Sequence, residues 1–250
     1  MIRREASSLI VAGHSHVGAL FGGSTAGEIF LQPVEGNEKI LGLHGPFPRT
    51  DDYWRILAEN AAGHSIVLLW QGNEQNAFFL VEQPPALDFV SRRVTWLPIA
   101  GDAVIVPEAL IRARLSCFLD PLHEVLCLLK EQTDCRIAVV GPPPPKEDNE
   151  YLRSVLASEF IYTQHREGAT VDDVELCSPT LRLKVWHVVQ ELYEEQAKND
   201  EVEFIPVPPL ALDKGGFLKQ EFWGPDLTHA NRDYGSLMID YLSLKLLGLP

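Results

Sequence analysis

The sequence of 250 residues lacks several features that define common classes of protein. No stretch approaches the roughly 18 apolar residues that a membrane-spanning helix needs. The apolar run that follows Arg3 and Arg4 extends only over Leu9–Ala12, which is too short for the core of a signal peptide. We therefore expect a soluble, cytoplasmic protein without a membrane span.

Cysteine and positive charge are both scarce. No two of the cysteines have CxxC spacing, which argues against a metal cluster and predicts reduced residues of the core. The four cysteines are Cys117, Cys127, Cys135 and Cys177. Lys and Arg number 21 against 35 Asp and Glu, which gives a formal net charge of −14. This charge disfavours binding to nucleic acid and to anionic lipid surfaces, because both are negatively charged.

The composition is otherwise that of an ordinary globular protein. Hydrophobic residues make up 46% of the chain and charged residues 22%, and a chain of this length can bury a sizeable core. We expect a single domain over residues 1–250, without internal repeats. A proline-rich excursion at about 83–107 is expected to contain one short strand, Arg93–Leu97.

Short apolar runs alternate with stretches of helical periodicity along the chain. Strands are expected at 8–12, at one of 29–34 and 39–43, at 65–70, at 136–140 and at 202–207. Helices are expected at 17–21, 51–61, 107–132, 147–162, 179–198 and 230–247. This alternation predicts an α/β fold, a three-layer α/β/α sandwich around a mostly parallel sheet.

Four loops of this predicted fold carry polar residues to one edge of the sheet, because the carboxyl ends of parallel strands meet there. Ser15 follows the first strand, a loop with Gly42 and Gly45 follows the second, and Asn73 follows the third. The segment 223–229 lies beyond the fifth strand. Residues that are distant in sequence are thus expected to converge.

Asp226 and His229 have the spacing at which a carboxylate accepts a hydrogen bond from imidazole Nδ1. Such an imidazole presents Nε2 as a base to Ser15, which needs one to become nucleophilic near neutral pH. Attack on an acyl carbonyl develops negative charge on its oxygen. Candidate donors to that oxygen are the Ser15 amide, a glycine amide and the Asn73 carboxamide. The residues predict acyl chemistry that requires neither a cofactor nor a metal.

Three blocks of the sequence resemble those of the SGNH/GDSL hydrolase superfamily. They are Gly13-His14-Ser15-His16, Asn73 and Asp226-Leu227-Thr228-His229. The resemblance implies a flavodoxin-like sheet of five strands in the order 2-1-3-4-5, and a serine esterase or acyltransferase mechanism. It also implies catalytic Ser15, Asp226 and His229, with Asn73 and a second-block glycine as oxyanion donors.

The sequence departs from the superfamily pattern at two places. His14 stands where Asp is usual, and Gln71-Gly72-Asn73-Glu74 stands where Gly-x-Asn-Asp is usual. The second-block glycine is either Gly42 or Gly45, and Gly45 is preferred because Pro46 and the start of a helix follow it.

Other interpretations of the same residues remain open. Taken singly, Ser15, Asn73 and Asp226 are typical of turns and helix caps. His14 and His16 together with Asp226 and His229 form a candidate zinc site. The G-x-S-x-G turn of α/β-hydrolases is absent, since Val17 occupies its last position.

The leading hypothesis is a serine-dependent hydrolase of a small or carbohydrate ester. Transfer of the acyl group to another alcohol and a non-catalytic binding protein with the same fold are the alternatives. Trp54, Trp70 and Trp223 are candidates for stacking on a sugar ring, although packing in the core or in a lid explains them better.

Overall fold

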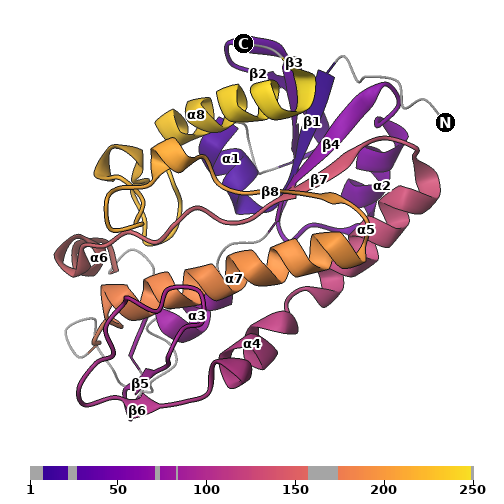
Figure 1. The fold of residues 1–250 in the computed structure, drawn as a ribbon. Helices are drawn as coiled ribbons and strands as arrows, with labels where there is room; N and C mark the ends of the chain where they lie inside the picture. The colour runs from indigo at the N-terminus through magenta and orange to yellow at the C-terminus, as the bar shows by residue number, and fades with distance from the viewer. Residues whose placement is uncertain (1–7, 22–26, 71–73, 83, 157–173, 249–250) are drawn as a thin grey trace.

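The computed structural model describes residues 8–21, 27–70, 74–82, 84–156 and 174–248 (Figure 1). Its central sheet has the strand order β2-β3-β1-β4-β7-β8, and every neighbouring pair is parallel except β2 and β3. The strands are β1 Ser8–Gly13, β2 Phe30–Val34, β3 Asn37–His44, β4 His64–Leu69, β7 Ile137–Val140 and β8 Glu203–Ile205.

The order β3-β1-β4-β7-β8 confirms the expected order 2-1-3-4-5. The sheet has one strand more than expected, because both of the apolar stretches at 29–34 and 39–43 form strands. They pair as an antiparallel hairpin whose turn contains Gly36 at a φ of 83°. A positive φ is costly for residues with a side chain, so glycine permits this turn.

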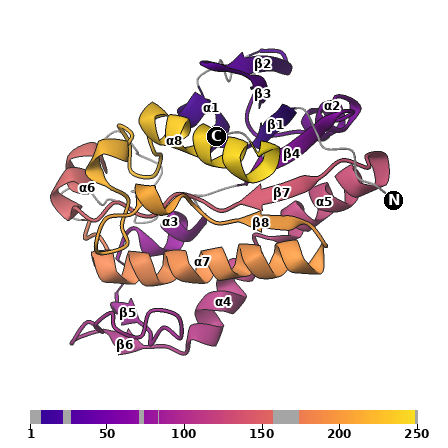
Figure 2. The same cartoon turned by 45° about the horizontal axis from the view of Figure 1, so that its top comes forward.

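Helices cover both faces of the sheet. They are α1 Ser15–Phe21, α2 Asp51–Glu59, α3 Glu74–Phe79, α4 Glu108–Ser116, α5 Asp120–Gln132, α6 Asn149–Leu156, α7 Pro179–Asn199 and α8 Arg232–Leu242. Successive residues of β1 alternate between two cores: Leu9 packs with α1 and α8, and Ile10 with α2, α5 and α7. Figure 2 shows α1 and α8 on one side of the sheet and α7 on the other. The predicted three-layer sandwich is confirmed.

Two predictions in the middle of the chain were wrong. The single helix expected at 107–132 is divided into α4 and α5, and Pro121 stands in the first turn of α5. Proline lacks an amide hydrogen and clashes with the preceding turn, so it begins a helix more readily than it continues one. No strand forms over 93–97, because the Ser91 hydroxyl accepts hydrogen bonds from the amides of Arg93 and Val94 and holds a turn there.

The cysteine prediction was correct in part. All four cysteines are free. Cys177 is buried, whereas Cys127 and Cys135 are half-buried and Cys117 is exposed, so only one of them is a core residue. None of the helices in the described ranges is both long enough and apolar enough to cross a membrane.

The excursion at 84–107 contains two short parallel strands, β5 Leu87–Asp88 and β6 Val104–Ile105. Its best-buried polar contact is the ion pair between Asp88 and Lys184 of α7, with Nζ 2.9 Å from Oδ1 and side chains 2% and 1% exposed. Asp88 also accepts hydrogen bonds from the amides of Phe89 and Ala100. One carboxylate thus orders the excursion and fastens it to α7.

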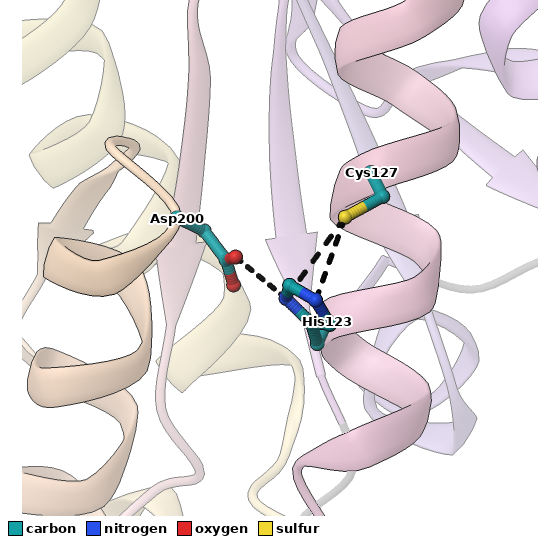
Figure 3. A group of neighbouring side chains, drawn as sticks. All are labelled: His123, Cys127 and Asp200. Carbon is teal, nitrogen blue, oxygen red and sulfur yellow. Dashed lines mark hydrogen bonds and ion pairs between the residues drawn. The ribbon is translucent and has the colours of Figure 1, made fainter.

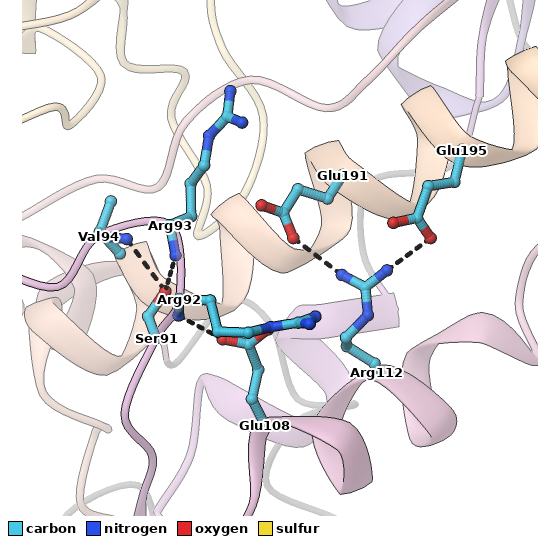
Figure 4. A network of polar contacts seen from close by, with 8 residues as sticks. All are labelled: Ser91, Arg92, Arg93, Val94, Glu108, Arg112, Glu191 and Glu195. Carbon is cyan, nitrogen blue, oxygen red and sulfur yellow. Dashed lines mark hydrogen bonds and ion pairs between the residues drawn. The ribbon is translucent and has the colours of Figure 1, made fainter.

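A second polar network ties the end of the excursion and α4 to α7 (Figure 4). The Glu108 carboxylate accepts hydrogen bonds from the backbone and side chain of Arg92. One turn further along α4, Arg112 pairs with Glu191 at 2.9 Å and with Glu195 at 2.5 Å. Because these pairs are partly exposed, each stabilises the fold less than the buried pair does.

We predict that Lys184→Met lowers the free energy of unfolding by about 3–5 kcal/mol, because it leaves the Asp88 carboxylate buried without a counter-ion. The double variant Asp88→Asn with Lys184→Met should lose less, since no uncompensated charge remains. Urea denaturation measures both, with Lys214→Met at an exposed position as the control. Equal losses in the single Lys184 variant and the control would contradict this role.

Candidate active site

The turn that carries Ser15 is set by the end of β1. Gly13 has a φ of 144°, and a Cβ placed on it would lie 2.0 Å from the carbonyl oxygen of Leu69 in β4. A side chain cannot fit there, so glycine is required both for the backbone angle and for the close approach of the two strands. The amide of His14 donates to the same carbonyl at 3.3 Å, and α1 begins at Ser15.

Ser15, His229 and Asp226 form a continuous chain of hydrogen bonds. His229 Nε2 lies 2.8 Å from Ser15 Oγ, and His229 Nδ1 lies 2.7 Å from Asp226 Oδ2. An ionised carboxylate only accepts hydrogen bonds, so Nδ1 carries the imidazole proton and Nε2 is left to accept from the serine hydroxyl. The structure therefore brings together three of the residues that the sequence singled out.

The other carboxylate oxygen of Asp226 holds the backbone of the loop that contains Asp226 and His229. Oδ1 accepts hydrogen bonds from the amides of Thr228 at 2.8 Å and His229 at 2.7 Å. Burial by itself would raise the pKa of Asp226, but the hydrogen bonds from His229 and the Thr228 amide outweigh it and hold the pKa below its ordinary value. Asp226 is therefore a carboxylate at neutral pH.

Buried groups from another part of the sheet hold this loop in place. Lys146, which is 2% exposed, follows the proline run after β7, and its Nζ donates to the carbonyl oxygens of Gly224, at 2.7 Å, and of Asp226. Tyr151 of α6 donates its hydroxyl to the same Gly224 oxygen at 2.7 Å. Neither residue was predicted from the sequence. The position of Lys146, a polar residue past the carboxyl end of a predicted strand, was the available signal.

Arg49 joins the loop after β3 to the serine turn. Its Nε donates to the Gly13 carbonyl at 2.7 Å, and its Nη1 donates to the carbonyl of Gly45. Tyr53 completes this link, since its hydroxyl accepts from the Gly13 amide and donates to the Leu43 carbonyl. Gly45, the predicted oxyanion donor, is thus buried in a loop fastened to the Ser15 turn. Asn73 lies outside the described residues, and α3 begins directly after it.

The two histidines beside Ser15 pack against other rings. His16 is 3% exposed, and its ring packs at 4.8 Å from that of His229. His14 packs against Trp54 and Trp70. Burial lowers the pKa of His16 to about 3 and that of His14 to about 4, so both are neutral at physiological pH.

The alternative of a zinc site at this turn does not match the geometry. Both ring nitrogens of His229 are engaged, with Asp226 and with Ser15. Within the described ranges, the ligand atoms of three His, Cys or carboxylate residues come together at His123, Cys127 and Asp200, and not beside Ser15.

Of the three tryptophans considered for sugar stacking, two lie in the core and one is partly exposed. Trp54 and Trp70 are buried and stack on each other at 5.4 Å, as expected for core packing. Trp223 is half-buried, and its indole nitrogen donates to the Leu218 carbonyl. Thr228, next to His229, lines a pocket of about 20 Å³ together with Lys146 and Trp186.

No family model matches the sequence, and no curated protein matches it. Several solved structures resemble the fold. A variant of an acetyl-xylooligosaccharide esterase from Geobacillus stearothermophilus is 11% identical, with 100% of this chain and 98% of that chain covered and a TM-score of 0.46.

Two further solved structures resemble it to a similar degree. A lipase/acylhydrolase from Enterococcus faecalis is 14% identical (96% of this chain and 97% of that chain covered, TM-score 0.40). The periplasmic domain of a lipopolysaccharide acetyltransferase from Salmonella ser. Paratyphi A is 11% identical (83% and 72% covered, TM-score 0.43). At such identities and scores the likeness by itself says nothing about the activity of this chain.

We predict that the free energy of unfolding decreases as the pH is lowered below about 6.5. In that range the histidines of the unfolded chain take up protons, whereas His14 and His16 in the folded protein do not. Each should cost about 1.4 kcal/mol of unfolding free energy per pH unit until the pH nears its folded-state pKa. Urea denaturation at pH 7.5, 6 and 5 measures the slope. His16→Phe keeps a ring at this position, and it should reduce the slope of the unfolding free energy against pH by the contribution of one proton. An unchanged slope in that variant would show that His16 is protonated in the folded protein.

Proposed function

We propose that the protein is a serine-dependent acyl-ester hydrolase that works through an acyl-enzyme. The observation that carries the proposal is the hydrogen-bonded chain from Asp226 through His229 to Ser15. Its three members come from opposite ends of the sequence and meet at the carboxyl edge of the sheet, where parallel α/β folds bind ligands.

In this proposal Ser15 Oγ attacks the ester carbonyl while His229 Nε2 accepts the hydroxyl proton. His229 then gives that proton to the departing alcohol, which leaves an acyl group on Ser15. Water attacks the acyl-enzyme in the second half of the reaction, with His229 again as the base. The bond between the acyl group and Ser15 Oγ then breaks, the carboxylic acid leaves, and His229 returns the proton to Oγ. Asp226 keeps the proton on Nδ1 and stabilises the imidazolium that forms in each half.

The developing negative charge on the carbonyl oxygen requires fixed donors. The Ser15 amide stands at the first position of α1, where a helix amide has no acceptor within the helix. We assign the other donor roles to the Gly45 amide and the Asn73 carboxamide. The link of Arg49 to both Gly13 and Gly45 supports a fixed distance between the two loops.

The proposed substrate is a small ester, including acetylated carbohydrates. The pocket beside Thr228 supports a small group, because its volume of about 20 Å³ matches one or two water-sized groups. The half-buried Trp223, near Tyr151, is the one tryptophan of the three candidates with exposed surface for a sugar ring.

Ser15→Ala is expected to lower kcat for short acyl esters by a factor on the order of 10⁴ to 10⁶, because the nucleophile is lost while the rest of the site remains. Labelling by a fluorophosphonate should disappear with it. Ser236→Ala, on the exposed face of α8, is the matched control and should hydrolyse and label like the unmodified protein. Equal labelling of the Ser15→Ala variant would rule out Ser15 as the nucleophile.

Lys146→Met is expected to lower kcat by about 10- to 100-fold, because misplacing Asp226 and His229 by a fraction of an ångström slows the chemistry. Methionine keeps the length of the side chain but offers no donor to the Gly224 and Asp226 carbonyls. Lys130→Met is the matched control, since Lys130 also donates to a backbone carbonyl, that of Asp200. A folded Lys146 variant with an unchanged kcat would show that the loop keeps its position without the ammonium group.

A further inference from the structure

A histidine, a cysteine and a carboxylate meet between α5 and the end of α7 (Figure 3). His123 and Cys127 lie four positions apart on α5, so they share one face of the helix. Asp200 follows the last residue of α7 and lies three positions before the first residue of β8. It therefore lies toward the amino end of that strand, whereas Ser15 follows the carboxyl end of β1.

The imidazole of His123 and the thiol of Cys127 lie close enough to become ligands of one metal ion. His123 Nε2 lies 3.6 Å from Cys127 Sγ. With zinc bound to nitrogen at about 2.0 Å and to sulfur at about 2.3 Å, two ligands of a tetrahedral ion are about 3.5 Å apart. The sulfur also lies 3.9 Å from Nδ1, beside the ring, so the side chain of Cys127 or of His123 rotates when both bind one ion at Nε2.

The other imidazole nitrogen is held by Asp200. His123 Nδ1 lies 2.6 Å from Asp200 Oδ1, which leaves Nε2 as the ring nitrogen directed away from the carboxylate. Asp200 is 6% exposed and is itself fixed, because its Oδ2 accepts from Gln196 at 2.6 Å. A carboxylate that orients a histidine in this way is the usual outer partner of a metal ligand, and it increases the basicity of the coordinating nitrogen.

We propose that His123 Nε2 and Cys127 Sγ bind a divalent cation of the zinc class, with Asp200 as the outer carboxylate. Binding turns the Cys127 thiol into a thiolate and releases its proton to the solvent, while water completes the coordination. Imidazole and thiolate favour such a cation over magnesium or calcium, which prefer oxygen ligands. The His123 side chain is 54% exposed, so an ion reaches the pair directly from solvent. None of the three residues belongs to the Ser15 site, so the inference is independent of the proposed function.

The full chain, treated with a chelator that is then removed, is titrated with Co²⁺ under reducing conditions. We expect one equivalent of Co²⁺ to produce a thiolate-to-cobalt charge-transfer band in the near ultraviolet, and Zn²⁺ to displace it. Cys127→Ser should abolish the band. Asp200→Asn should weaken Co²⁺ binding by about tenfold, the usual effect of losing an outer partner.

Cys117→Ser is the matched control, because it removes an exposed thiol on a neighbouring helix and should bind Co²⁺ like the unmodified chain. Cys127 is half-buried, so serine at that position is expected to fold, and thermal unfolding of the variant verifies this. The proposal is overturned if the unmodified chain gives no charge-transfer band, or if the band persists in Cys127→Ser.

Discussion

Gly13 lies so close to the backbone of Leu69 that the ends of β1 and β4 leave no room for a Cβ between them. This contact determines where the chain can turn, because only glycine combines the close approach with the backbone angle found there. The register of the two parallel strands pairs Gly13 with Leu69, so the turn starts where β4 also ends. Ser15 consequently stands at the start of α1 at the rim of the sheet, half-buried and within reach of His229.

The two carboxylate oxygens of Asp226 hold different parts of the loop that contains His229. Oδ1 of Asp226 orders the backbone through two amides, and Oδ2 orients the imidazole. Because a carboxylate has lone pairs for both tasks, the loop conformation and the direction of the imidazole are coupled. A change that moves the loop therefore also moves the nitrogen that faces Ser15, so residues that contact only the loop affect the distance between His229 and Ser15.

The sequence was sufficient for the parallel strands β1, β4, β7 and β8, because parallel strands that are covered on both faces appear as continuous apolar runs such as Ile66–Leu69. It also singled out Ser15, Asp226 and His229, which the structure joins by hydrogen bonds and whose catalytic role stays a prediction. It failed where a single polar contact decides the local structure, as with the Ser91 hydroxyl that replaces the expected strand by a turn. Lys146 and Arg49 escaped notice because they act on backbone carbonyls, and no residue pattern marks a carbonyl as an acceptor.

The sequence did not predict the pairing of His123 with Cys127, because CxxC spacing is absent and the candidate zinc ligands His14 and His16 lie at the Ser15 turn. A histidine and a cysteine on one helical face leave a weaker signal, and Asp200 joins them only through the packing of α5 against the end of α7. Spacing within one element is visible in a sequence, whereas a partner from another element becomes visible only when the fold is known.

Two buried cations, Arg182 and Lys146, donate hydrogen bonds to backbone carbonyls near Asp226. Arg182 is 4% exposed and donates to the carbonyls of Cys177, Lys146 and Glu147, so it holds the segment that presents Lys146. Lys146 in turn binds the backbone oxygen of Asp226 and not its carboxylate. An ammonium group on the carboxylate would compete with His229 for the same lone pairs and weaken the orientation of the imidazole. Binding the backbone instead fixes the loop and leaves both carboxylate oxygens to the groups that connect it with Ser15.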